Sequence, residues 1–374
     1  MVELVPPLVQ AWERPSAPRP IVVIGAGGIV RDAHLPAYRR LGFDVKGLFD
    51  LKPERARELA DEFGVRRIYR SVEEAVAEPD AVFDVAVPAV AVADVISRLP
   101  RGAAVLIQKP MGSDLEDARN ILGLCQGLEL IAAINFQLRF SPNMLALRDA
   151  LRRGLLGRVT DVEVRINTHT PWHLWPFLRG IPRHEVLYHS IHYLDLLRAL
   201  LGEPRGAFAK VVHNPLGELE AYSDTSTSII LDYGSELRVS LTMNHQHRFG
   251  AEYARSQLKV EGTDAAVVAR MGVNLDYPKG RPDTFSFASA NGAWGSMPLR
   301  GSWFTEAFEG PMSNLMRFVA GEDAVLESRV ADAIKTMAVV EACYQSSASG
   351  GTPIPALPPP AAAPKDPSEG TVET

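Results

Sequence analysis

The chain has 374 residues, of which 46% are hydrophobic and 22% charged, with a formal net charge of -6. This length suits about two domains, because one core usually serves ~100 to 200 residues. The mild acidity argues against a nucleic-acid partner, which needs a basic surface to neutralise phosphates. The sequence has no apolar run of about 18 residues and no basic-then-apolar leader, so we expect no membrane contact and a cytoplasmic location.

The first part of the chain alternates short apolar runs with amphipathic stretches, after a proline-rich arm at 1–19 that has no periodic pattern. Buried strands separated by helices predict a doubly wound parallel sheet covered on both faces. We assign this domain to residues 20–142. Its predicted strands are Ile21–Ile24, Phe43–Phe49, Val82–Val87, Ala103–Ile107 and Leu130–Ile134, and its predicted helices include Pro53–Phe63, Ser71–Ala77 and Ser113–Cys125.

The second part of the chain has a different pattern. Two predicted helices, Asn143–Arg153 and roughly Pro182–Leu201, precede strands that follow one another through turns, which predicts a large, mainly antiparallel sheet. We assign residues 143–356 to this α+β domain, and the Pro/Ala-rich residues 357–374 to a flexible tail. The predicted strands are Ala207–His213, Thr225–Asp232, Glu236–Asn244, Gln257–Gly262 and Ala265–Met271, and the last predicted helix is Val330–Ser346.

A glycine-rich loop follows the first predicted strand, with the sequence Gly25-Ala26-Gly27-Gly28-Ile29. Gly25 permits a tight turn, and Gly27 lets backbone N–H groups approach a pyrophosphate at the N-terminus of the next helix. Val30 stands where a small residue usually allows close helix–strand packing. The loop predicts a Rossmann-type dinucleotide site.

Asp50 indicates which dinucleotide this site prefers. It ends the second predicted strand, 25 residues after Gly25, where a carboxylate can accept hydrogen bonds from ribose hydroxyls. The same carboxylate would repel a 2'-phosphate. We therefore expect NAD as the cofactor in preference to NADP.

Three later segments, in their order and spacing, resemble the Gfo/Idh/MocA family of NAD(P)-dependent oxidoreductases (glucose-fructose oxidoreductase, inositol dehydrogenase and relatives). They are Gln108-Lys109-Pro110, the stretch 135–142 and the stretch 187–195. The resemblance covers about residues 20–355. It implies a Rossmann domain followed by an α+β domain, a small-molecule carbohydrate substrate, and a homodimer or homotetramer.

The first of these segments resembles the family's Glu-Lys-Pro signature, which implies that Lys109 approaches both the nicotinamide and the reacting hydroxyl. Lys109 also follows a parallel strand at its carboxyl end, where open α/β sheets bind their ligands. Gln108 replaces the usual glutamate, so a carboxylate that could tune the lysine is missing. The resemblance adds Pro88 and Gln137 to the expected cofactor contacts.

The third segment resembles the family's catalytic helix, which carries Asp-x-x-x-His. His192 matches the histidine, whereas Tyr188 stands at the aspartate position. At about 100° per residue, Glu185, Tyr188, His189 and His192 share one face of a helix. A tyrosine hydroxyl can act as acid or base, so we predict a catalytic group of Lys109, His192, Tyr188 and His189. Asp195 has the pattern of a structural partner for a cation.

The second domain also supplies candidates for substrate contacts. Stacking aromatics and hydrogen-bond donors in the stretch 169–177 suit a sugar ring, although a packed loop covering the sheet explains them equally well. The predicted substrate-binding residues are Arg139, Trp172, His173, Trp175, Glu185 and His189. We expect no metal, because His184 and His189 are one residue too far apart for an HExxH site and only two cysteines occur.

Three functions are compatible with these residues. The first is hydride transfer between a nicotinamide cofactor and a carbinol of a sugar, polyol or sugar derivative, with Lys109 and His192 in proton transfer. The second is an NAD-dependent glycoside hydrolase or lyase that oxidises the ring transiently and regenerates its cofactor. The third is a non-catalytic dinucleotide-binding regulator.

Overall fold

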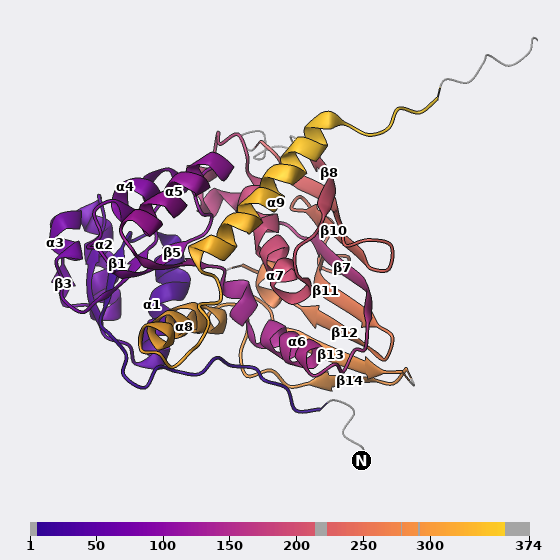
Figure 1. Cartoon of the computed structure of the whole chain (residues 1–374), viewed down its shortest axis with the longest axis horizontal. Helices are drawn as coiled ribbons and strands as arrows, with labels where there is room; N and C mark the ends of the chain where they lie inside the picture. Colours follow the sequence, from indigo (N-terminus) through magenta and orange to yellow (C-terminus); the bar gives the residue numbers. More distant parts are fainter. Residues whose placement is uncertain (1–5, 214–222, 278, 291, 356–374) are drawn as a thin grey trace, which may run out of the picture.

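The computed structural model describes residues 6–213, 223–277, 279–290 and 292–355, so the predicted tail 357–374 lies outside the described residues. Figure 1 places residues 20–140, coloured indigo to purple, beside a large sheet, with helices α6, α7 and α9 between the two. These helices are Pro142–Arg152, Ile191–Leu201 and Val330–Ser349. No helix of the described chain is long and apolar enough to cross a bilayer.

The first sheet has six parallel strands in the order β3-β2-β1-β4-β5-β6. This order reverses direction between β1 and β4, which is the switch point where doubly wound sheets bind ligands. The prediction of a doubly wound parallel sheet is confirmed. The strands are β1 (Ile21–Ile24), β2 (Val45–Phe49), β3 (Arg67–Ile68), β4 (Val82–Val85), β5 (Ala104–Gln108) and β6 (Ile131–Asn135).

Helices cover both faces of this sheet because successive strand residues point to opposite sides. One face packs on α1 (Leu35–Leu41), α2 (Pro53–Phe63) and α8 (Glu309–Val319). The other face packs on α3 (Val72–Val76), α4 (Val92–Ile96) and α5 (Leu115–Gly127). Helix α8 is a late segment of the chain that returns to cover β5 and β6.

The second sheet has eight strands in the order β14-β13-β12-β11-β7-β10-β9-β8. All neighbours are antiparallel except β7 and β10, so the prediction of a large, mainly antiparallel sheet is confirmed. The strands are β7 (Val159–Asn167), β8 (Gly206–Val212), β9 (Ser226–Asp232), β10 (Arg238–Asn244), β11 (Arg255–Gly262), β12 (Ala265–Arg270), β13 (Thr284–Ser289) and β14 (Trp294–Met297). Sequence analysis predicts five of them and omits β7, β13 and β14.

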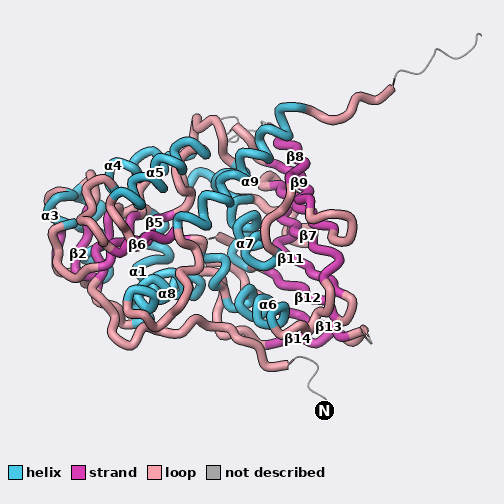
Figure 2. Tube along the Cα trace, in the orientation of Figure 1, coloured by secondary structure: helices cyan, strands magenta, loops and turns pink. Residues whose placement is uncertain are grey.

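The two faces of the second sheet differ in what covers them. Val162, Val164 and Ile166 of β7 point into the core that the sheet shares with α7 and α9. Between them, Glu163 and Arg165 line a broad, open hollow of about 580 Å³ on the outer face. Figure 2 shows helices on only one side of these strands. Assembly into a dimer or tetramer through the outer face stays a prediction.

The arm at the start of the described chain is extended and anchored at several points. The indole of Trp12 donates to Asp323, packs edge-on against Phe140 and lies under the guanidinium of Arg148. The backbone N–H of Val9 donates to Asp149 at 3.1 Å. The arm thus ties α6 to the loop after α8, as its path along one side of the molecule in Figure 1 shows.

Candidate active site

The predicted cofactor loop lies at the switch point of the first sheet. Gly25 has φ +107°, and a Cβ there would lie 2.2 Å from the carbonyl oxygen of Ala86, just after β4. Only glycine fits so close an approach in this conformation. Gly25 therefore brings the loop after β1 against the segment 86–88 after β4, which ends at the predicted contact Pro88.

The next part of the loop faces open space. Positions for a Cβ at Gly27 and Gly28 have no atom within 4 Å, and Gly28 begins the helix that follows. The helix then makes a π-helical turn at Val30–His34, and Val30 itself is fully buried among Ile21 and Val23. A valine at the third position is thus accommodated in the core. The exposed backbone beside a helix N-terminus fits the pyrophosphate of a dinucleotide.

Asp50 lies beside this loop at the end of β2. One oxygen of its carboxylate accepts from the backbone N–H of Ala26 at 2.8 Å, and the other accepts from the N–H of Lys52 at 2.8 Å. Each carboxylate oxygen can accept a second hydrogen bond. Asp50 therefore holds the glycine loop in place and keeps acceptor capacity for ribose hydroxyls.

Lys109 projects from the end of β5 toward the helix that carries Tyr188. Its Nζ donates to the carbonyl oxygen of Tyr188 at 3.1 Å and lies 5.9 Å from the centre of the tyrosine ring. Burial lowers the pKa of Lys109 to about 8 because the charged ammonium loses water. A lysine with this pKa exchanges protons near neutral pH.

The helix that carries Tyr188 is capped at its start by a carboxylate that is distant in the sequence. The backbone N–H groups of His184 and Glu185 both donate to Asp224 Oδ1, at 2.7 and 3.1 Å. Residues Val186–Ser190 then form a π-helical turn that runs directly into α7. Single π turns inside helices occur frequently at functional sites, and this one carries both Tyr188 and His189.

His189 and His192 stand on the same side of this helix as Lys109. Burial lowers the pKa of both histidines well below its usual value, and the ammonium of Lys109 lowers both further. Both are therefore neutral at pH 7. The Nδ1 atom of His192 has no hydrogen-bond partner among the described residues, although the side chain is only 7% exposed. Its ring packs edge-on against Trp303 at 5.3 Å.

The aromatic stretch 169–177 contributes unevenly to the site. Trp172 is buried and packs edge-on against His189, with ring centres 5.2 Å apart, and against His245 at the same distance. Trp175 packs on Tyr277, whose hydroxyl donates to Asp32 in the turn after the glycine loop. The side chain of His173 is exposed, and no contact joins it to the other candidates among the described residues.

Glu185, in contrast to the part-buried Tyr188, is fully buried. Its carboxylate accepts from Ser190 and Thr227, and it pairs with the imidazole of His245 at 3.2 Å. Ser190 follows Glu185 by five residues, which is the spacing of the π turn. The carboxylate of Glu185 is occupied by these internal partners, so its predicted role in substrate binding has no support in these contacts, and the shared face stays a prediction.

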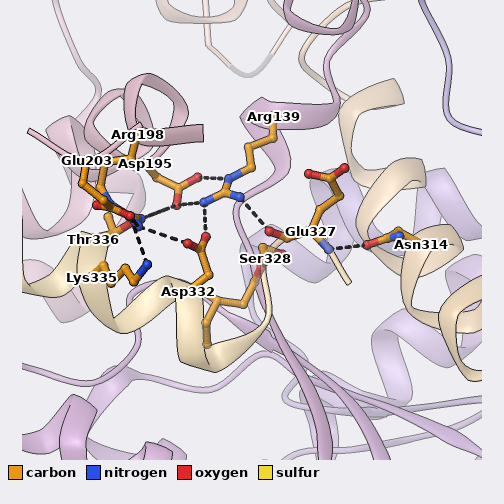
Figure 3. Close-up of polar contacts among 11 residues, drawn as sticks. Arg139, Asp195, Arg198, Glu203, Asn314, Glu327, Ser328, Asp332, Lys335 and Thr336 are labelled. Carbon is orange, nitrogen blue, oxygen red and sulfur yellow. Dashed lines mark hydrogen bonds and ion pairs between the residues drawn. The ribbon is translucent and has the colours of Figure 1, made fainter. Parts of the chain in front are cut away.

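Arg139 also has internal partners. In Figure 3 its guanidinium lies between Asp195 and Asp332 and reaches the carbonyl oxygen of Glu327. The two carboxylates raise the pKa of Arg139 against the opposing effect of burial. Arg139 is 5% exposed, so the structure leaves its predicted substrate contact without support. Asp195 is a cation partner, as predicted.

Three amide side chains at the ends of β5 and β6 were only partly foreseen. Gln108, Asn135 and Gln137 are each buried with an acceptor oxygen that lacks a partner among the described residues. Gln108 and Asn135 are paired neighbours in the sheet. The sequence points to Gln137 and Gln108 but not to Asn135, whose signal is its position at the carboxyl end of β6.

His245 and Trp303 are two further residues of the site. His245 is fixed by Thr170 at 2.8 Å and by Glu185, and its ring lies 4.1 Å from that of His189. His247 lies two residues from His245 in the sequence, and this clustering of histidines is a weak indication of a functional role. Nothing local marks Trp303. Within the described ranges, no three His, Cys, Asp or Glu side chains are arranged to hold a metal ion.

Comparisons with known proteins give the family. Residues 19–136 match the model of an oxidoreductase family with an NAD-binding Rossmann fold, and residues 144–268 match the GFO/IDH/MocA C-terminal domain. D-apiose dehydrogenase of Paraburkholderia graminis is 28% identical over 88% of each chain, and inositol 2-dehydrogenase of Rhizobium meliloti is 25% identical over 80% of this chain and 88% of the relative.

A solved structure has the same fold. An oxidoreductase from Agrobacterium radiobacter, determined in complex with NAD+, L-tartaric acid and magnesium, superposes with a TM-score of 0.74 at 19% identity, covering 90% of this chain and 98% of that chain. The family models, the dehydrogenases among its relatives and this shared fold agree. The chain belongs to the Gfo/Idh/MocA family of NAD-binding oxidoreductases.

Proposed function

We propose that this protein is an NAD-dependent dehydrogenase that oxidises a carbinol of a sugar, polyol or sugar derivative, or reduces the corresponding ketone. One observation carries the proposal: Lys109 reaches from the carboxyl end of β5 to the turn that carries Tyr188 and His189, beside His192. This brings proton-transfer groups from both domains to the edge where a dinucleotide would lie. The relatives named after apiose and inositol support a carbohydrate substrate.

The residues of the site divide the work. Gly27 and Gly28 would cradle the pyrophosphate, Asp50 would bind the ribose, and Gln137 offers a free acceptor oxygen. When bound, NAD supplies the acceptor for a hydride. Lys109 and His192 remove the proton of the substrate hydroxyl, since one has a pKa of about 8 and the other is neutral with a free Nδ1.

Tyr188 and His189 orient the substrate in this proposal. Tyr188 is half-buried and burial raises the pKa of its hydroxyl, which keeps it protonated and able to donate. His189 is held by edge contacts with Trp172 and His245. Fixing the ring of a sugar in one orientation lowers the entropic part of the barrier.

Two measurements test the proposal. Fluorescence titration should give a tighter complex with NADH than with NADPH, and a panel of sugars and polyols with NAD should give net NADH. The variant Asp50→Asn should bind NADPH about tenfold better relative to NADH, because it removes the charge that repels a 2'-phosphate. Lys46→Gln, an exposed change on the same strand, is the control.

Several results would contradict this function. Binding of neither nucleotide would leave the oxidoreductase proposal untenable. Tighter binding of NADPH by the unchanged protein would reverse the role given to Asp50. Cleavage of a glycoside without net NADH would replace the dehydrogenase with the hydrolase or lyase that the sequence left open.

A further inference from the structure

We propose that the pocket beside Lys109 is built for a substrate that carries a carboxylate near the reacting carbinol, so that sugar acids and other hydroxy acids are preferred to neutral sugars. The inference rests on the proposed function, because it names the substrate class of the same site.

The first argument is the missing counter-charge of Lys109. Its Nζ has one hydrogen bond, to a backbone carbonyl oxygen, and it forms no ion pair with a described Asp or Glu. Its other close neighbour is the face of the Tyr188 ring. Cations in protein interiors are normally paired, because an unpaired charge costs free energy. An anionic group of a bound ligand could therefore form the missing ion pair with Lys109.

The second argument is that both expected carboxylates have been replaced. Gln108 stands where the Glu-Lys-Pro signature has glutamate, and Tyr188 stands at the aspartate position of the helix. Neither replacement can carry a negative charge at neutral pH. The pocket is therefore two negative charges short of the pattern that it resembles.

The third argument is that the acids nearest the site are committed elsewhere. Glu185 accepts from Ser190 and Thr227 and pairs with His245 behind the pocket. Asp224 accepts two backbone N–H groups at the start of the same helix. Neither carboxylate is available to Lys109. The groups that do face Lys109 are neutral, namely Tyr188, His189 and His192.

The fourth observation is an independent sign of a ligand. His192 is more than nine-tenths buried, yet its Nδ1 has no partner among the described residues. Buried polar atoms without a partner are uncommon in native proteins. A neutral imidazole with one free nitrogen beside an ammonium can accept a proton while that ammonium holds an anion.

These groups allow a balanced step with an acid substrate. With an acid substrate, the carboxylate accepts hydrogen bonds from Lys109 and His189, which keeps Lys109 protonated and leaves the removal of the hydroxyl proton to His192 alone. The hydride leaves the carbinol carbon with its electron pair, the C–O bond becomes C=O, and the hydroxyl proton passes to His192. The products are a keto acid, a protonated His192 and the reduced nicotinamide, so charge and atoms balance.

Matched pairs of compounds test the preference. D-gluconate is compared with D-glucitol, and D-galacturonate with D-galactose, by kcat/KM with NAD. Intrinsic tryptophan fluorescence, to which Trp172 beside His189 contributes, reports the Kd of each compound for the complex with NADH, which does not depend on turnover. We expect the acid of each pair to be favoured about tenfold or more in both measurements. Above pH 8, kcat/KM for the acid should fall as Lys109 loses its proton.

Two variants that differ only in charge sharpen the test. Tyr188→Asp places a carboxylate beside Lys109, whereas Tyr188→Asn places a neutral side chain of the same size there. The ratio of acid to neutral kcat/KM should be about tenfold lower in Tyr188→Asp than in Tyr188→Asn. A general disturbance of the turn would affect both variants alike.

The outcomes separate this inference from the proposed function. NADH formation from neutral sugars in preference to their acids, or equal ratios in the two variants, would overturn the inference and leave the dehydrogenase standing. Tight binding of the acids without any turnover would support the anion site and defeat the dehydrogenase.

Discussion

Helix α7 connects two clusters of ionisable residues: in one the cation has no ion-pair partner, and in the other every charge is paired. Near its start, Lys109 lies beside the neutral His189 and His192 and forms no ion pair with any Asp or Glu of the described residues. Three residues after His192, Asp195 belongs to a network that runs from the core to the surface and in which every charge is paired (Figure 3). The members of this second cluster are Arg139, Asp195, Arg198, Glu203, Asp332 and Lys335.

The comparison teaches how one helix serves two purposes. The paired cluster links α7 to α9 and to the turn after β6, so it fixes the second domain relative to the first. The unpaired cluster stands where β5 meets the helix. Charge that is left uncompensated destabilises a fold, so its retention in one place indicates work done on a ligand.

The largest expected effect follows from removing the unpaired cation. Lys109→Met keeps the length of the side chain but cannot transfer a proton, so we expect kcat/KM to fall about 10² to 10⁴-fold. The melting temperature should not fall, because a part-buried charge without an ion-pair partner has been removed. Lys210→Met, on the exposed face of β8, is the control for both measurements. Activity within tenfold of the parent would contradict the role of Lys109.

Removing a cation from the paired cluster should have the opposite signature. Arg139→Met removes the closest cation of the buried Asp195 and one of the two cations of the part-buried Asp332, and we expect a loss of about 3–5 kcal/mol in the free energy of unfolding. Urea denaturation measures it. Lys335→Met, which breaks only a contact with Glu203 at the surface, should cost under about 1 kcal/mol. Equal losses in the two variants would remove the distinction between core and rim of the network.

The smallest effect concerns the dependence of stability on pH. The pKa of Lys109 is about 8 in the folded protein and 10.5 in the absence of structure, so the unfolded state binds more protons between these values. The parent protein should therefore gain stability relative to Lys109→Met as pH rises from about 8 to about 10.5. Thermal unfolding of both proteins across this range checks it. A constant difference would mean that Lys109 is not desolvated.

The parts of the site that directly follow a strand can be predicted from the local sequence. The glycine loop, Asp50 and Lys109 each follow directly from a strand, so their places at one sheet edge are predictable. Contacts between residues that are far apart in the sequence cannot be predicted in this way. Arg139 pairs with Asp332, 193 residues later, and no local pattern reveals that partner.

Two other differences have identifiable physical reasons. Strand β7 alternates buried Val162 and Val164 with Asp161, Glu163 and Arg165, and its polar outer face hides its position in the middle of the sheet. The carboxylate of Glu185 accepts from Ser190, five residues later, because the turn at Val186–Ser190 is π-helical, so 100° per residue does not describe this segment. An amphipathic pattern cannot show where a helix changes its pitch.

The return of α8 to the first sheet has a consequence for how the molecule is made. Met312, Leu315 and Met316 cover apolar residues of β5 and β6, including Leu106 and Ala133. During synthesis this surface is exposed until about half a chain length beyond β6 has been made, since β6 ends at Asn135 and α8 ends at Val319 and domains begin folding as they emerge. A fragment ending at residue 142 would keep that surface exposed. The nucleotide half therefore matures last, although its sheet is synthesised first.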